Sequence, residues 1–205
     1  MEKHSPRETR GEGRFRTTHV VGSRKDVLAK IPKEKIKKKF SFGTVSFPAA
    51  PYTLLKFGTT NINKADWENY QALPEIVKQQ FTPKTRMERG VIFQDIVMDF
   101  DGAPSLSMDD HYRQFGKIDN VYFWTKIEEL RGIFLNAKQL PFDIFHGGYN
   151  IMIKKTSEDT WLPIIIDFKR LGKRSYLFQP QLLLNSEMRK KFLRRFKRFE
   201  DKYRA

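Results

Sequence analysis

Short apolar runs in the first half of the chain predict β-strands. Gly11 and Gly22 flank a stretch rich in Thr and Val, which indicates a tight turn that leads into a strand. Residues 26–32 (DVLAKIP) indicate a second short strand, which Pro32 ends. Residues 91–98 (VIFQDIVM) form an apolar run with the length of one buried strand. The first half is therefore expected to contain a small sheet.

Apolar residues recur at helical spacing further along the chain. Asn63 can cap a helix that continues to about Leu73, where Pro74 ends it. A longer helix, capped by Asp119 or Asn120, is predicted to reach about residue 138. Six apolar positions indicate it: Val121, Trp124, Ile127, Leu130, Ile133 and Phe134.

A final helix is predicted from Ser186 to about Tyr203. Its apolar stripe consists of one methionine and four aromatic residues: Met188, Phe192, Phe196, Phe199 and Tyr203. Seven Lys or Arg residues between Arg189 and Arg198 cover the rest of its surface. We expect the stripe to pack on the protein rather than to enter a lipid bilayer.

The connecting segments carry turn and loop signals. Residues 33–60 mix lysines with Gly, Pro and isolated aromatics, which indicates an insertion or long loop with room for one strand at 40–47. Residues 99–105 (DFDGAPS) indicate a turn-rich connector, and Ser107 after it is an N-cap candidate. Residues 141–150 indicate a loop, and 150–166 a β-hairpin.

The order of these elements predicts an α+β protein with two lobes. Strands and one helix come first, then a connector, helices, a loop, a hairpin and a basic helix. This is the layout of a protein-kinase-like fold, reduced in its second lobe because only 38 residues follow Asp167. We expect a β-rich N-lobe with one αC-like helix over 1–98, including a basic insertion near 33–60. A hinge over 99–105 and a helical C-lobe over 106–205 then follow.

Several positions in this order have the chemistry that phosphoryl transfer requires. Glycine turns let backbone N–H groups approach phosphate, a strand lysine contacts the phosphates, and a helix carboxylate positions that lysine. An Asn and an Asp near the hairpin hold Mg²⁺. The candidate residues for ATP and Mg²⁺ are Gly11, Gly13, Lys30, Glu68, Asn150 and Asp167. Each taken singly is an ordinary turn or surface residue, so the hypothesis depends on their joint occurrence in this order.

The general base of a kinase catalytic loop is missing. It is an Asp five residues before the Asn, and here that position is Phe145. Asp143 and His146 are weaker candidates for the same role. General-base help is worth roughly 10²–10⁴-fold in rate. Slow transfer or no catalysis is therefore expected, and whether the protein is an enzyme stays open.

The chain resembles the YrbL-type proteins, the PhoP regulatory network family of small bacterial proteins with a kinase-like fold. The resemblance runs from about Gly11 to Phe199 and is most specific in residues 96–105 (IVMDFDGAPS), 148–152 (GYNIM) and 163–167 (PIIID). It implies an N-lobe, a hinge and a reduced C-lobe, with ATP-site positions at Lys30, Glu68, Asn150 and Asp167. The lysine-rich segment is longer than is usual in that family, and residues 145–149 lack its Leu-Lys-Pro pattern.

Composition narrows the classes of protein. With 39% hydrophobic and 14% aromatic residues among 205, the chain can bury a core and is not intrinsically disordered. The absence of cysteine excludes disulfides, thiolate metal sites and cysteine nucleophiles. A mean hydropathy of −0.61 argues against a membrane span, and no secretory signal is evident, so a cytoplasmic location is expected. Serine and zinc hydrolase motifs are missing.

Charge leaves a second function open. The net charge is +15, and the excess lies at the two ends: residues 169–205 hold 13 basic and 3 acidic residues. Besides a nucleotide-binding pseudokinase or slow kinase, the chain can be an adaptor that binds an acidic protein or an anionic membrane surface through its basic ends. Nucleic acid is the weaker partner, because no recognition motif is present. The oligomeric state is not predicted.

Overall fold

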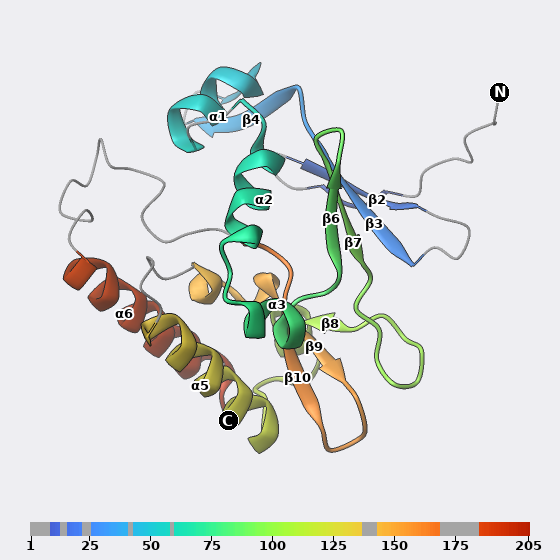
Figure 1. Ribbon diagram of the computed structural model, residues 1–205, viewed down its shortest axis with the longest axis vertical. Coiled ribbons are helices and arrows are strands. Elements are labelled where there is room, and N and C mark those ends of the chain that lie inside the picture. Colours follow the sequence, from blue (N-terminus) through green and yellow to red (C-terminus); the bar gives the residue numbers. More distant parts are fainter. Residues whose placement is uncertain are drawn as a thin grey trace. The chain divides into compact units, whose positions relative to one another are not determined.

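The computed structural model describes residues 9–12, 16–21, 26–40, 43–57, 60–136, 143–168 and 185–205 (Figure 1). These residues form antiparallel sheets and several helices, which confirms the predicted α+β class. The chain divides into two compact units: Met1–Glu68 with Lys84–Ile96, and Asn69–Pro83 with Val97–Ala205. Residues 69–83, which we expected in the first lobe, thus cluster with the second unit.

The first unit contains a five-stranded antiparallel sheet in the order β1-β2-β3-β7-β6. Its strands are β1 (Thr9–Glu12), β2 (Arg16–Val21), β3 (Val27–Pro32), β6 (Thr85–Glu88) and β7 (Val91–Asp95). The predicted strands near 16–21, 26–32 and 91–98 are therefore confirmed, although the last one ends at Asp95. The hairpin turn between β6 and β7 is Arg89-Gly90, and both residues have positive φ, as a two-residue hairpin loop requires.

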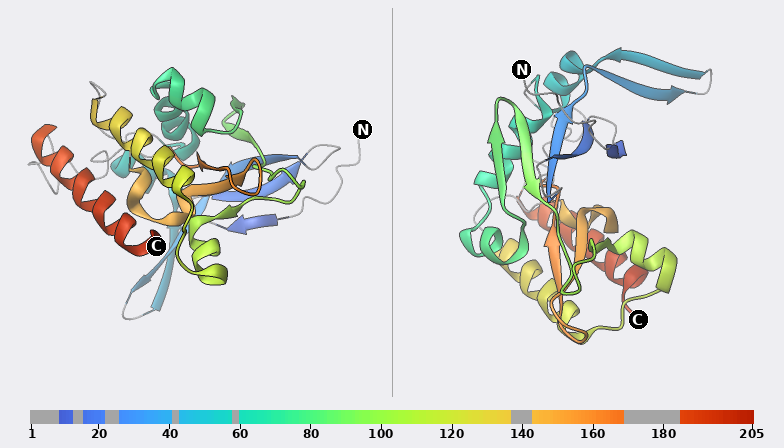
Figure 2. Two further views of the ribbon diagram at one scale, coloured as in Figure 1. Left: turned by 90° about the horizontal axis from the view of Figure 1, so that it is seen from below. Right: turned by 90° about the vertical axis from the view of Figure 1, so that its right-hand side faces the viewer.

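Two predictions for the first unit are wrong. Gly11 lies in β1 opposite Thr18 and not in a turn, while Gly13 lies outside the described residues. The segment 33–60 is not a loop: it forms the hairpin of β4 (Lys35–Phe40) and β5 (Gly43–Pro48), followed by α1 (Ala49–Phe57) (Figure 2). The one strand predicted there, at 40–47, corresponds to β5, whereas the lysine-rich strand β4 and the helix α1 were not predicted.

Helix α2 (Ile62–Gln71) begins one residue earlier than its predicted cap. The Asn61 Oδ1 accepts a hydrogen bond from the backbone N–H of Asn63 at 2.9 Å, so Asn61 has the capping role that we assigned to Asn63. The side chain of Asn63 is fully buried and donates through Nδ2 to the carbonyl oxygens of Lys30, at 2.6 Å, and Gly90, at 2.9 Å. Asn63 thereby fixes α2 to β3 and to the β6–β7 turn.

The second unit is built on helices and a three-stranded antiparallel sheet in the order β10-β9-β8. Its elements are α3 (Glu75–Phe81), β8 (Leu106–Ser107), α4 (Met108–Phe115), α5 (Val121–Asn136), β9 (Ile151–Lys155), β10 (Trp161–Ile165) and α6 (Asn185–Tyr203), with the short turns η1 (Ile144–His146) and η2 (Gly148–Asn150). Sequence patterning missed α3 and β6, which are short. The predicted hairpin near 150–166 is confirmed as β9 and β10.

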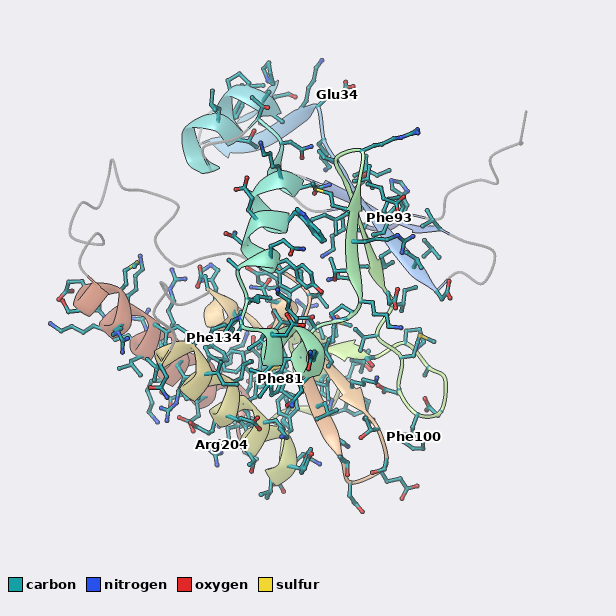
Figure 3. All side chains as sticks on the ribbon, viewed as in Figure 1. Glu34, Phe81, Phe93, Phe100, Phe134 and Arg204 are labelled. Atoms are coloured by element: carbon teal, nitrogen blue, oxygen red, sulfur yellow. The ribbon has the colours of Figure 1, made fainter. Side chains whose placement is uncertain are left out.

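Helices α5 and α6 lie side by side (Figure 2) and enclose the aromatic core of the second unit. All five stripe residues of α6 are buried, which confirms the predicted packing of the stripe. Phe81 and Phe134, labelled in Figure 3, belong to the same core. No helix in the described part of the chain is long and apolar enough to cross a membrane.

The predicted caps of α4 and α5 are confirmed. The Ser107 Oγ accepts a hydrogen bond from the backbone N–H of Asp110. The Asn120 Oδ1 accepts from the backbone N–H of Phe123 at 2.8 Å, so Asn120 and not Asp119 caps α5. The connector before α4 is turn-rich, as predicted: Asp99 accepts hydrogen bonds from the Ser105 hydroxyl and from the backbone N–H of Lys155. The connector is thereby attached to the end of β9.

Candidate functional site

Lys30 lies on the central strand of the sheet in the first unit. Its backbone pairs with Thr18 of β2 on one side and with Ile92 of β7 on the other. Only 9% of the residue is exposed. A lysine is rarely so buried unless its ammonium group meets an anionic or hydrogen-bonding partner. The position of Lys30 therefore identifies a place in this unit that is built to hold a positive charge.

The buried carboxylate of α2 is Asp66, two residues before the predicted Glu68. Glu68 is exposed, whereas Asp66 is only 2% exposed. Asp66 lies three residues after Asn63, so the two side chains share one face of α2. Asn63 donates to the Lys30 carbonyl oxygen, and that face therefore meets β3 at Lys30. Asp66 could have been found from the sequence by matching the helix face to Asn63.

Asn150 and Asp167 are brought together in the second unit. The backbone oxygen of Asn150 accepts a hydrogen bond from the N–H of Ile166 at 3.0 Å, which places Asn150 next to Asp167 at one end of the β9–β10 hairpin. Phe168, which follows Asp167, is buried and packs on Tyr70 with ring centroids 5.0 Å apart. The hairpin thus brings the backbones of Asn150 and Asp167 close to each other, and their role as a pair of metal ligands stays a prediction.

The Asn150 side chain fits an oxygen-ligated cation. It is 2% exposed, and its Oδ1 has no hydrogen-bond partner among the described residues. A buried carbonyl oxygen in that state needs an explanation, and a bound ion is one of the usual ones. Mg²⁺ takes few protein ligands and completes its shell with water and phosphate oxygens. Within the described segments, no group of three or more His, Asp or Glu side chains is arranged to hold a metal by itself.

Phe145, which the predicted kinase-like layout puts at the position of the general base, belongs to the hydrophobic core. Its ring lies 4.9 Å from that of Phe196, 5.1 Å from Phe199 and 5.5 Å from Phe192. Asp143, the first substitute considered, is buried and forms an ion pair with Arg195 of α6. His146, the second, is exposed. Asp143, the carboxylate nearest in sequence to Phe145, is therefore already paired with the guanidinium group of Arg195.

A hydrogen-bond network around Tyr203 fastens the C-terminal helix to the loop that carries Asn150. The Tyr203 hydroxyl accepts from the backbone N–H of Gly148 at 3.0 Å and from the Lys202 ammonium at 2.7 Å, and it donates to Asp109. Gly148 is required there, because a Cβ would come within 2.8 Å of the Asp109 backbone nitrogen and of the tyrosine ring. The predicted stripe included Tyr203 but gave no sign of this polar role.

The network also shifts the affinities of its members for protons. Burial would raise the pKa of Asp109, but the hydrogen bonds from Tyr203 and Lys202 outweigh it and hold that pKa below its usual value. Burial, together with the bond to Asp109, raises the pKa of Tyr203. The hydrogen bond to Tyr203 raises the pKa of Lys202. Near neutral pH the network therefore consists of a carboxylate, a neutral phenol and an ammonium group.

No protein-family model matches the chain, and no curated protein matches it either.

Proposed function

We propose that the chain is a kinase-like protein of the YrbL type that binds Mg²⁺-nucleotide, and that it acts as a pseudokinase or as a slow phosphotransferase. The observation that carries the proposal is the burial of Lys30 on the third strand of the first sheet, beside the polar face of α2. In protein kinases the lysine that contacts the nucleotide phosphates is on the third strand, and a carboxylate of helix αC positions it. Asp66 has the better placement for that second role here, and Glu68 the poorer one.

The second unit supplies the metal ligands in this proposal. The backbone hydrogen bond between Asn150 and Ile166, the residue before Asp167, supports this assignment, because in kinases the catalytic-loop Asn and the Asp-Phe-Gly aspartate together hold Mg²⁺. Two protein oxygens suffice for Mg²⁺ when nucleotide phosphates supply the others. Gly11 lies in a strand, so the proposal no longer includes it as a residue of the turn that contacts the phosphates. Gly13 stays a prediction.

The environment of the catalytic loop favours slow chemistry or none. Phe145 has no titratable group, and Asp143 is bound to Arg195. Phosphoryl transfer depends mainly on positioning and charge stabilisation, so a loss of about 10²–10⁴-fold leaves a measurable reaction. Any phosphate transfer would thus depend on how the nucleotide site positions ATP and Mg²⁺, because neither Phe145 nor Asp143 can act as a general base.

Titration with ATP and Mg²⁺, followed by calorimetry and thermal denaturation, tests the proposal. Wild-type protein should be stabilised by about 2.7 kcal/mol when ligand is present at 100 times its Kd. Lys30→Met and Asp167→Asn should abolish the effect. The matched controls Lys84→Met and Asp159→Asn change exposed residues of the same two units and should retain it. No stabilisation of the wild type by Mg²⁺-ATP would refute the proposal.

A transfer assay then separates the two forms of the proposal. Label from the γ-phosphate of ATP should appear slowly in product or on the protein if the chain is an atypical kinase, and this label should disappear in Asp167→Asn. Nucleotide binding without any label leaves the pseudokinase. The two outcomes differ only in catalysis, because both require the same bound nucleotide.

An adaptor function has one specific observation in its favour. The apolar stripe of α6 is buried while Arg189, Arg194 and Arg198 on the same helix are exposed. Any acidic protein or anionic membrane surface would therefore meet α6 by charge alone, without insertion of the stripe. Such binding weakens steeply as salt concentration rises. Affinity for anionic vesicles that does not change between low and high salt would exclude this alternative.

A further inference from the structure

A cavity of about 450 Å³ lies within the second unit, beside the C-terminal half of α6. The turns η1 and η2 form its other wall, through His146, Gly147 and Tyr149. None of the residues assigned above to nucleotide or Mg²⁺ lines it. The cavity therefore needs an account of its own.

Three cations of α6 converge on this cavity. Arg195, Arg198 and Lys202 all line it, and Asp109 is the one carboxylate among its lining residues. Their spacing of three and four residues places them on one helix face, where like charges destabilise each other. Such a row of positive charges destabilises the helix unless anionic groups neutralise it. The charge pattern thus favours an anionic occupant.

The carboxylates near the cavity do not neutralise all three cations. Asp143 pairs with Arg195, and Asp109 pairs with Lys202 at 3.0 Å. Arg198 has no ion-pair partner in the part of the chain that the structure describes. Positive charge is therefore in excess at this end of the cavity.

We propose that this cavity binds the phosphate group of a small phosphorylated molecule. Arginine forks match phosphate oxygens in paired hydrogen bonds, and a dianion suits several cations better than a single carboxylate does. The volume is within the range of about 300–1,000 Å³ that small-ligand sites occupy, and it exceeds what phosphate alone would fill. The ring of Tyr149, half exposed at the cavity wall, offers an apolar surface for the organic part of the ligand.

The proposal is independent of the nucleotide site, and two arginines of α6 test it. Arg194 and Arg198 lie one turn apart, both are exposed, and only Arg198 lines the cavity. Arg198→Gln and Arg194→Gln therefore remove the same charge from the same helix. Calorimetry with glycerol 3-phosphate, at constant ionic strength, should give about ten- to hundredfold weaker binding for Arg198→Gln. Arg194→Gln should stay within about twofold of wild type.

Two further ligands test whether the cavity selects phosphate over carboxylate, and a small molecule over a lipid surface. Malonate at the same concentration should bind more weakly than glycerol 3-phosphate, because it lacks the tetrahedral oxygens. An equal loss of affinity in the two arginine variants would overturn the proposal. So would the absence of binding of glycerol 3-phosphate at about 10 mM, since a Kd above that value is too weak for a specific site. Binding only to vesicles that contain phosphatidic acid would also overturn it, since the occupant would then be a lipid surface.

Two further variants separate this site from the nucleotide site. Lys30→Met should lose the response to Mg²⁺-ATP and keep the binding of glycerol 3-phosphate. Arg198→Gln should show the reverse. Loss of both responses in either variant would indicate one shared site and would contradict the proposal.

Discussion

The two units differ in what they bury. The large apolar cluster of the protein belongs entirely to the second unit, where Phe, Ile and Met side chains from α3, α5, α6 and the hairpin pack together. In the first unit the described buried residues include two isoleucines, Ile62 and Ile92, and small apolar residues such as Ala29. Beside these the unit buries polar residues, among them Lys30, Asn63 and Asp66. Burial of apolar area is the main source of folding free energy. The second unit therefore gains more folding free energy from apolar burial than the first unit does. Part of the interior of the first unit consists of polar groups, which suit the binding of a ligand.

The contrast extends to the loop with Asn150. Ile144 and Phe145, which precede Asn150 in this loop, are buried in the apolar core. The side-chain Oδ1 of Asn150 is also buried, but it has no hydrogen-bond partner among the described residues. The same loop is thus stable at one end and available for a ligand at the other. Substitutions in the two regions should therefore differ in their effect on the free energy of unfolding.

Phe145→Ala should give the largest loss. The substitution removes a buried ring from contact with three phenylalanine rings of α6, and such a cavity costs about 3–5 kcal/mol. Urea denaturation measures it. Tyr149→Ala, a change of similar size at a half-exposed position nearby, should cost only about 0.5 kcal/mol. Similar losses for both would mean that this loop is not anchored in the core of the second unit.

Gly148→Ala should destabilise the protein by about 1–3 kcal/mol. The new methyl group would come within 2.8 Å of the Asp109 backbone and the Tyr203 ring, so the Tyr203 network has to move. Gly132→Ala in α5 meets no atom within 4 Å and should stabilise by about 0.5–1 kcal/mol, because alanine favours helix. Thermal denaturation of the two variants should therefore shift in opposite directions, and a shared direction would contradict the close packing at Gly148.

Sequence patterning predicted the second unit better than the first for a physical reason. The stripe of α6 and the hairpin follow regular periods because a large apolar core enforces them. In the first unit, polar side chains share the packing with apolar ones, so the pattern predicts Asn63 as a cap when it is a buried cross-link. The same pattern does not distinguish the exposed Glu68 of α2 from the buried Asp66. The cavity beside α6 was not predictable, since it depends on how Arg198 and Tyr149, 49 residues apart, approach each other.

Acid should weaken the second unit through His111. Burial lowers the pKa of His111, and the nearby charge of Lys155 lowers it further. The folded state therefore binds the proton less readily than the unfolded state, whose pKa is about 6.5. This contribution to stability is complete above pH 6.5 and decreases as pH falls towards the lower folded pKa. Urea denaturation at pH 7.5 and 5.5 should show the loss, and His111→Gln should reduce it.

The smallest effects should come from the two asparagine caps, one in each unit. Asn61→Ala removes the cap of α2, and Asn120→Ala removes that of α5 together with a hydrogen bond to the Asp159 carbonyl oxygen. Each cap is worth about 1 kcal/mol. Serine at either position should restore most of the cap, so Asn61→Ser and Asn120→Ser are the controls. Hydrogen exchange locates the effect: Asn61→Ala should accelerate exchange in α2, because three of its five buried residues (Asn63, Asp66 and Asn69) are polar, while α5 should stay protected in Asn120→Ala. Faster exchange in α5 than in α2 would reverse the contrast between the units.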